Sequence, residues 1–227
     1  MPLFSRRLPF DRKKLLDQAE AAAKKRRYRR AVLLYRQLLA AEPRNAGLHA
    51  RIAPLLARTG HRFDAWESFR IAGEAPEIAD DPARAAKHFE QASRALPRNL
   101  DAWRALARAR LRYQKPDAAL EALREGRLCF RSRRTSSQAI ALLRDAREIS
   151  PWDPKIVLDL ARLLARNGQA AEALFLLDAM ERRCQGRELR DLRALVLRID
   201  PTFGNIWRWL RSPSKPTAGA RPQTRRA

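Results

Sequence analysis

The sequence has 227 residues, which is enough for one large domain or two small ones with a buried core, and which excludes a peptide or a disulfide-stapled miniprotein. Alanine (40), leucine (32) and arginine (40) are abundant, whereas valine (3), isoleucine (8) and threonine (5) are scarce, so the composition favours an all-α fold over an all-β or doubly wound α/β one. The 48 Lys and Arg residues against 25 Asp and Glu residues give a net charge of +23, which indicates an anionic partner: nucleic acid, an anionic membrane or an acidic protein face.

The chain begins with a short arm, residues 1–11, that lacks the apolar core of a signal peptide. No apolar run approaches the ~20 residues of a membrane-spanning helix. The two cysteines, Cys129 and Cys184, are too few for a disulfide framework and lack CxxC spacing, so a reducing compartment is expected. These features predict a cytoplasmic protein.

Three prolines in similar settings, Pro43, Pro97 and Pro151, are 54 residues apart. An alanine stands twelve residues before each proline, and a large side chain and a third apolar residue follow it at offsets of four and seven. Residues at these offsets lie on the same side of a helix. These triplets are Ala31, Tyr35 and Leu38; Ala85, Phe89 and Ala92; and Ala139, Leu143 and Ala146. A second set of triplets has the same spacing: Ala65, Phe69 and Ala72; Ala119, Leu123 and Gly126; and Ala173, Leu177 and Met180. The two sets alternate at intervals of 34 and 20 residues, which predicts three helices in each 54-residue unit.

The extra 20 residues of each unit are predicted to form one added helix and its linker. The helices are expected at residues 82–96 and 138–149, and the linkers at 73–81 and 127–137. Pro54 falls inside another predicted helix, where it should remove a backbone hydrogen bond and produce a kink.

The 34-residue interval between helical signatures resembles the tetratricopeptide repeat. Ala31, Ala65, Ala119 and Ala173 stand where that family has the small residue of its second helix, Trp103, Leu106 and Ala107 stand for the Trp, Leu and Gly of its first, and Gly60 and Gly168 occupy its turns. Alanine replaces the family's first-helix glycine in all four repeats, so the resemblance is to a divergent member. It implies an all-α helical-repeat solenoid of about 11–13 helices over residues 12–201.

The segment after this domain differs in character. Residues 202–211 are predicted to form a short helix that caps the apolar edge of the last repeat, with Trp209 pointing elsewhere, where it could contact a partner or a membrane surface. The residues expected on the capping side are Phe203, Ile206, Trp207 and Leu210. Residues 212–227 contain prolines and cations but no acids, which is typical of a flexible basic tail.

Motifs of catalysis are missing from the sequence. The three histidines, His49, His61 and His88, lack metal-ligand spacing and are expected at the surface, with His61 in a loop. The eight glycines form no phosphate-binding loop, and neither a GxSxG elbow nor catalytically spaced carboxylates occur. We therefore expect a non-enzymatic protein without metal, cofactor or small-molecule substrate.

Two basic stretches are candidate patches for anions or nucleic acid. The first, at a predicted turn, comprises Lys24, Lys25, Arg26, Arg27, Arg29 and Arg30. The second, in a predicted linker, comprises Arg131, Arg133 and Arg134. A purely solvated face is an equally plausible interpretation of the first stretch.

The family resemblance implies a ligand groove lined by first-helix positions. Nine of those positions are basic, and the partner-binding residues predicted among them are Arg58, Arg104, Arg108, Arg112, Lys155, Arg162 and Arg166. Such a groove would bind an acidic protein or peptide through charge-assisted hydrogen bonds, and the chain would be a non-catalytic scaffold or adaptor. The asparagines of the family's carboxylate clamp are absent from these positions, which disfavours a chaperone cofactor.

Two alternatives stay open. Sequence-tolerant nucleic-acid binding through the two patches and the tail accounts better for the net charge. Docking on an anionic membrane through the tail and the Trp207 helix is the third hypothesis.

Overall fold

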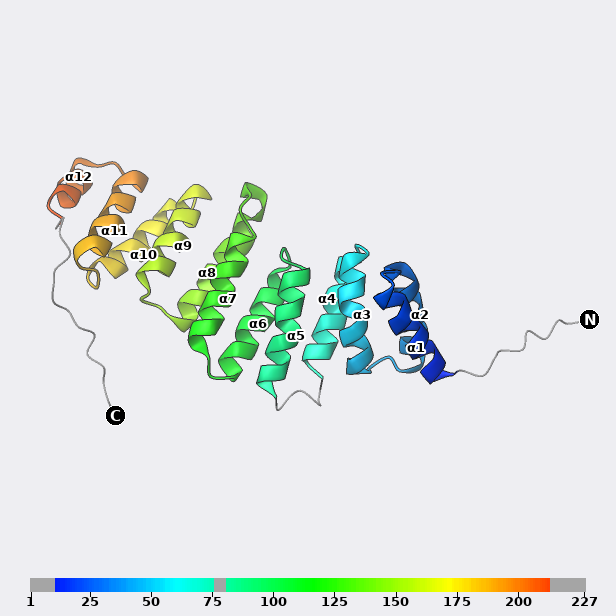
Figure 1. The fold of residues 1–227 in the computed structure, drawn as a ribbon. Helices are drawn as coiled ribbons and strands as arrows, with labels where there is room; N and C mark the ends of the chain where they lie inside the picture. The colour runs from blue at the N-terminus through cyan, green and yellow to red at the C-terminus, as the bar shows by residue number, and fades with distance from the viewer. Residues whose placement is uncertain (1–10, 76–80, 213–227) are drawn as a thin grey trace, which may run out of the picture. The chain divides into compact units, whose positions relative to one another are not determined.

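The computed structural model describes residues 11–75 and 81–212. Within these residues the chain forms twelve α-helices, one 3₁₀ turn and no strand (Figure 1), which confirms the predicted all-α fold. The chain divides into two compact units, residues 1–122 and 123–227, so the predicted repeat domain is shared between them. Apart from Asp11 and Ser212, the arm and the tail predicted from the sequence lie outside the described residues.

The first unit is built from helices that pack in successive pairs. Helix α1 packs against α2, α3 against α4 and α5 against α6, and α3 also contacts α5. The bounds are α1 (Arg12–Lys24), α2 (Tyr28–Ala41), α3 (Ala46–Arg58), α4 (Arg62–Gly73), α5 (Pro82–Ala95) and α6 (Leu100–Arg112); α7 (Pro116–Leu128) contains the boundary between the units.

The second unit continues with helices of similar length. Helix α9 packs against α8 and α10, α11 contacts both α9 and α10, and α12 packs on α11. The bounds are η2 (Arg133–Thr135), α8 (Ser136–Ile149), α9 (Pro154–Arg166), α10 (Ala170–Glu181), α11 (Gly186–Ile199) and α12 (Phe203–Leu210).

Helix positions recur at 54-residue intervals along the chain. Helices α2, α5 and α8 begin at residues 28, 82 and 136, while α3, α6 and α9 begin at residues 46, 100 and 154. A recurring N-cap explains the second series, because a side-chain oxygen before each helix accepts a backbone hydrogen bond from its first turn. Asn45 accepts from Leu48, Asn99 from Ala102 and Asp153 from Lys155, at 3.0, 3.0 and 2.8 Å.

The turns after α1, α3, α6 and α9 share one left-handed residue. Its φ angle is +56° at Arg26, +88° at Gly60, +54° at Gln114 and +84° at Gly168. The next N–H then reaches back into the last helical turn, as when the N–H of Arg27 donates to the Ala22 carbonyl at 2.9 Å. Glycine adopts this conformation without steric cost, whereas Arg26 and Gln114 carry a Cβ there.

The predicted faces form the core, because all eighteen residues of the two triplet sets are buried. Small residues allow the helices to approach closely. At the end of α4, a Cβ added to Gly73 would lie only 2.6 Å from Cζ of Phe89 on α5. The ring of Phe89 in turn lies beside Trp66, with ring centres 6.4 Å apart.

Several local expectations need correction. Arg127 belongs to α7 rather than to a linker, because good helix formers continue to Leu128. Pro54 does lie inside a helix, as predicted, since α3 continues through it to Arg58, and the kink stays a prediction. Of the three histidines only His61 is exposed, since His49 lies on the inner face of α3, with Nε2 2.9 Å from the Pro43 carbonyl oxygen, and His88 is half-buried.

The last helix also presents a different face from the one expected. Phe203, Ile206, Trp207 and Leu210 are all exposed, so they do not cap the preceding helices. Trp209 is instead half-buried, with the guanidinium of Arg190 from α11 at 5.6 Å from its ring centre. The reason is that polar contacts hold the opposite side of α12 against α10 and α11.

Candidate functional site

A hollow that we call the basic cleft opens between α9 and α11 in the second unit. Its volume is about 500 Å³, and it is lined by Arg162, Ala165, Arg166, Ala170, Leu195, Arg198 and Ile199. The three arginines are exposed, whereas Leu195 is buried. Guanidinium groups therefore surround an apolar floor, and no acidic side chain is among the lining residues.

Helix α9 places Arg162 and Arg166 one turn apart on the same face, while Val157, Leu160 and Leu164 are buried on the other side. Asp159, one turn before Arg162, contributes a carboxylate oxygen 3.5 Å from the Arg162 guanidinium. Its second oxygen lies 3.1 Å from Arg127 of α7. Asp159 thus shares its charge between two arginines and leaves Arg162 only partly neutralised.

Arg166 and Arg198 form no ion pair with any acid in the part of the chain that the structure describes. Two guanidinium groups that face each other across a small hollow repel one another unless an anion is placed between them. A carboxylate is the group that a guanidinium binds with two parallel hydrogen bonds. The cleft can therefore accept a carboxylate beside an aliphatic side chain.

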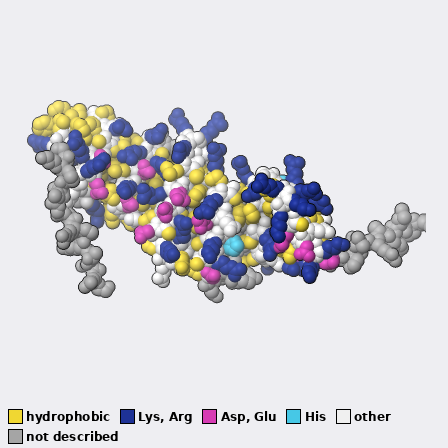
Figure 2. Space-filling model, viewed as in Figure 1, with side chains coloured by type: hydrophobic (Ala, Val, Ile, Leu, Met, Phe, Trp, Pro, Cys, Tyr) yellow, Lys and Arg dark blue, Asp and Glu magenta, His cyan; other side chains and the backbone are white. Residues whose placement is uncertain are grey.

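A second site, which we call the arginine cluster, comprises Arg26, Arg27, Arg29, Arg30 and Arg58 in the first unit. These residues, with Tyr28 and Thr59, line a hollow of about 580 Å³. Arg26 and Arg27 come from the turn between α1 and α2, Arg29 and Arg30 from the first turn of α2, and Arg58 from the last turn of α3. Figure 2 shows Lys and Arg side chains gathered over this end of the unit.

One contact fixes the geometry of the arginine cluster. The Arg58 guanidinium donates to the Tyr28 hydroxyl at 2.6 Å and lies 5.1 Å from the centre of its ring. The other four arginines have no acidic partner within residues 11–75 and 81–212. Arg26 adds backbone strain, since it is one of only two non-glycine residues with positive φ among the described residues.

The groove residues predicted from the sequence are distributed over both units. Arg162 and Arg166 line the basic cleft, Arg58 belongs to the arginine cluster, and Lys155 is exposed in the first turn of α9. The other three, Arg104, Arg108 and Arg112, lie on α6 in the first unit, where the helix that contacts α3 is α5. Their role in a groove stays a prediction.

The remaining patch residues are at the surface. Lys24 and Lys25 are exposed at the end of α1, and Arg131, Arg133 and Arg134 are exposed around η2. The Arg131 Nε donates to the Leu128 carbonyl at 2.9 Å, which holds this arginine against the end of α7.

Sequence reasoning missed Arg198, Leu195 and Ile199, which form the α11 wall of the basic cleft. A signal for this helix was present, because Leu192, Leu195 and Ile199 follow helical spacing. The predicted repeat domain, residues 12–201, includes this helix, but the groove positions implied by the resemblance end at Arg166.

No group of three or more His, Cys, Asp or Glu side chains that could hold a metal ion occurs among the described residues. None of the helices in residues 11–75 and 81–212 combines the length and the apolar character needed to cross a bilayer. Burial, together with the nearby Glu188 and Glu181, raises the pKa of the Cys184 thiol.

A protein-family model described as tetratricopeptide repeat matches residues 78–134 and 136–196, just over half of the chain. A comparison with curated proteins gives no match.

A comparison with solved structures gives matches of low sequence identity. A TPR repeats protein from Bacteroides fragilis is 15% identical, with 88% of this chain and 96% of that chain covered and a TM-score of 0.44. The pilF protein of Pseudomonas aeruginosa is 16% identical, with 88% and 87% covered and a TM-score of 0.29. A tetratricopeptide repeat protein from Parabacteroides merdae is 14% identical, with 87% and 89% covered and a TM-score of 0.31.

Proposed function

Because this chain belongs to the tetratricopeptide repeat family, we propose that it is a non-catalytic protein–protein interaction scaffold that binds an acidic protein or peptide through a basic surface. The observation that carries the proposal is the basic cleft, where three arginines from α9 and α11 surround an apolar floor. Helical repeats bind extended or helical peptides on faces formed by neighbouring helices, and α9 and α11 are such neighbours.

The chemistry of the cleft defines the partner more closely. Bidentate guanidinium contacts select carboxylates, and the Leu195 and Ile199 side chains favour an aliphatic residue between them. The matching peptide has glutamates or aspartates on both sides of a leucine, isoleucine or valine. Its affinity is expected to fall with added salt, since the arginines are exposed.

The arginine cluster supports the same class of partner from the first unit. Its five guanidinium groups would contact a further acidic stretch of the bound protein. A partner with two acidic segments would gain affinity from occupying both sites, because the second contact becomes intramolecular.

The experiment is a fluorescence-anisotropy titration of the full chain with a labelled synthetic peptide in which glutamate pairs flank a leucine. The test variant is Arg166→Glu with Arg198→Glu, which reverses two charges in the cleft. The matched control is Arg182→Glu with Arg187→Glu, two exposed arginines of the same unit that do not line the cleft. Both variants change the net charge equally, so any difference between them reports the site.

We expect the cleft variant to bind the peptide at least about tenfold more weakly, and the control to stay within about threefold of the natural protein. Equal losses in the two variants would mean that binding follows net charge alone, and would overturn the assignment of the cleft. A single-stranded oligonucleotide that binds more tightly than the peptide, and that the cleft variant does not weaken, would instead favour the nucleic-acid hypothesis.

A further inference from the structure

Helix α12 has its apolar side turned to solvent, which is the reverse of an ordinary surface helix. Phe203, Ile206, Trp207 and Leu210 stand at positions i, i+3, i+4 and i+7 and form one continuous stripe. Phe203 is 82% exposed and Leu210 is 59% exposed. Figure 2 shows the resulting hydrophobic surface over α12, and we call these four residues the apolar stripe.

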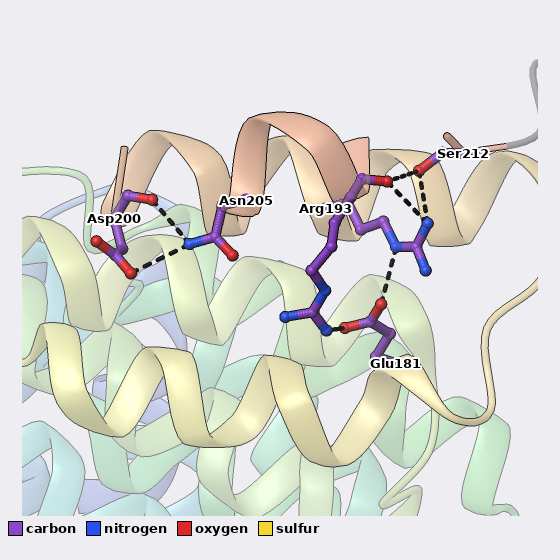
Figure 3. A network of polar contacts seen from close by, with 6 residues as sticks. Glu181, Arg193, Asp200, Asn205 and Ser212 are labelled. Carbon is purple, nitrogen blue, oxygen red and sulfur yellow. Dashed lines mark hydrogen bonds and ion pairs between the residues drawn. The ribbon is translucent and has the colours of Figure 1, made fainter. Parts of the chain in front are cut away.

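Polar contacts hold α12 in this orientation at both ends (Figure 3). At its start, Asn205 Nδ2 donates to the carbonyl and to a carboxylate oxygen of Asp200, at 3.0 and 3.1 Å. At its end, Arg193 Nη1 donates to the Arg208 carbonyl at 2.9 Å and to the Ser212 hydroxyl at 3.2 Å.

Glu181, at the end of α10, joins the three last helices. Its carboxylate accepts from Arg193 Nε of α11 at 2.8 Å and forms a second ion pair with Arg208 of α12. The Glu181 side chain is only 14% exposed, so these pairs are weakly screened by solvent. The network leaves α12 little freedom to turn its apolar stripe inward.

The sequence that carries the stripe is basic. The sequence from residue 201 onward contains no acid and six cations: Arg208, Arg211, Lys215, Arg221, Arg225 and Arg226. The Arg211 guanidinium lies 4.6 Å from the centre of the Trp207 ring, at the edge of the stripe. Aromatic and aliphatic side chains bordered by arginines match the boundary between lipid headgroups and acyl chains.

We propose that the apolar stripe of α12 docks on the surface of an anionic lipid bilayer, with Phe203, Trp207 and Leu210 entering the interface and Arg211 contacting lipid phosphates. Since α12 has only eight residues, it lies on the bilayer and does not cross it. This proposal is independent of the basic cleft and gives the scaffold a second binding surface, for membranes.

A second copy of the chain fits the stripe less well. The four side chains expose on the order of 450 Å², well below the ~800 Å² that each partner buries in a standard protein interface. Two stripes packed face to face would also bring like charges together, because Arg211 lies at the edge of each.

The test is co-sedimentation of the full chain with vesicles of phosphatidylglycerol and phosphatidylcholine, compared with vesicles of phosphatidylcholine alone. The variant Phe203→Ser with Leu210→Ser removes the two most exposed aliphatic and aromatic members of the stripe without touching the polar network. The matched control is Phe175→Ser on α10, because Phe175 is 74% exposed and lies outside the stripe. All three proteins carry the same charge, so general electrostatic attraction cannot separate them.

We expect binding to the anionic vesicles, little binding to the neutral ones, and a loss of about tenfold or more in the partition coefficient of the stripe variant only. Far-ultraviolet circular dichroism should show the same helix content for the three proteins. Equal vesicle binding by the stripe variant and the control would overturn the proposal. So would a dimer seen by analytical ultracentrifugation that the stripe variant abolishes while the natural protein fails to bind vesicles. Failure of the vesicle test leaves the peptide titration of the cleft unaffected, so the two proposals stand or fall separately.

Discussion

Replacing Arg26 with glycine should stabilise the first unit and weaken anion binding by the arginine cluster. Arg26 has a φ of +56°, a conformation in which a Cβ costs about 1–2 kcal/mol. Glycine removes that cost but loses about 0.5–1 kcal/mol through the greater freedom of the unfolded chain. The net gain therefore lies between about 0 and 1.5 kcal/mol, and its midpoint of about 0.8 kcal/mol raises Tm by about 3 °C for a unit of this size.

Gln114→Gly is the matched control, because Gln114 has a φ of +54° in the equivalent turn after α6. Its backbone N–H donates to Leu111 at 2.9 Å, and that of Arg26 donates to Ala23 at 3.0 Å, so the two turns are built alike. Gln114 does not line the arginine cluster. Both variants should gain similar stability, and only Arg26→Gly should lose anion affinity.

The assay combines thermal unfolding followed by far-ultraviolet circular dichroism with calorimetric titration of inorganic pyrophosphate. A stability gain for Gln114→Gly but not for Arg26→Gly would refute the reasoning, because it would mean that the Arg26 side chain stabilises the turn by contacts outside the backbone. Unchanged pyrophosphate binding by Arg26→Gly would remove Arg26 from the anion site.

Three further outcomes can be checked. Gly73→Ala should lower the free energy of unfolding in urea by about 1–3 kcal/mol, since the new Cβ would meet a buried aromatic ring 2.6 Å away. Iodoacetamide should modify Cys129 faster than Cys184, whose pKa burial raises, as peptide mass spectrometry would show. Hydrogen bonding to Arg12 lowers the pKa of Glu42, so its stabilising effect is present above the ordinary carboxyl pKa and fades as pH falls through the lowered one. Glu42→Gln should therefore be less stable at neutral pH and match the natural protein in acid, as urea midpoints across pH would reveal.

The sequence was most informative where a pattern repeats. Alanine at the same offset before each of three prolines predicts a helix with a buried small residue, and Ala31, Ala85 and Ala139 are 0–4% exposed. The ends of these helices could be predicted because they depend on local contacts. An N-cap and a left-handed turn each involve residues only three or four positions apart.

The orientation of α12 could not be predicted in the same way. Its apolar spacing resembles that of any helix that covers a core, and the contacts that turn its other side toward α10 and α11 include Glu181, which is distant in sequence. Half of the basic cleft was missed for a related reason. Arg198 lies outside the groove positions implied by the repeat resemblance, and its proximity to Arg162 arises from packing.

Sequence period and packing period differ in this chain, and that difference limits how functional residues can be assigned by repeat position. The sequence pattern returns after three helices, whereas the helices pack in pairs. A helix of a given sequence type therefore alternates between the two places of a pair: α6 is the second member of the pair α5 and α6, while its equivalent α9 is the first member of the pair α9 and α10.

Arg108 and Arg162 occupy equivalent positions 54 residues apart, yet only Arg162 lines the basic cleft with a wall supplied by α11. Alanine-rich faces suit both places, because a small side chain fits beside either neighbour. One type of sequence unit can therefore occupy either place in a helix pair. Binding residues have to be identified from the helices that pack together and not from their position in the repeat alone.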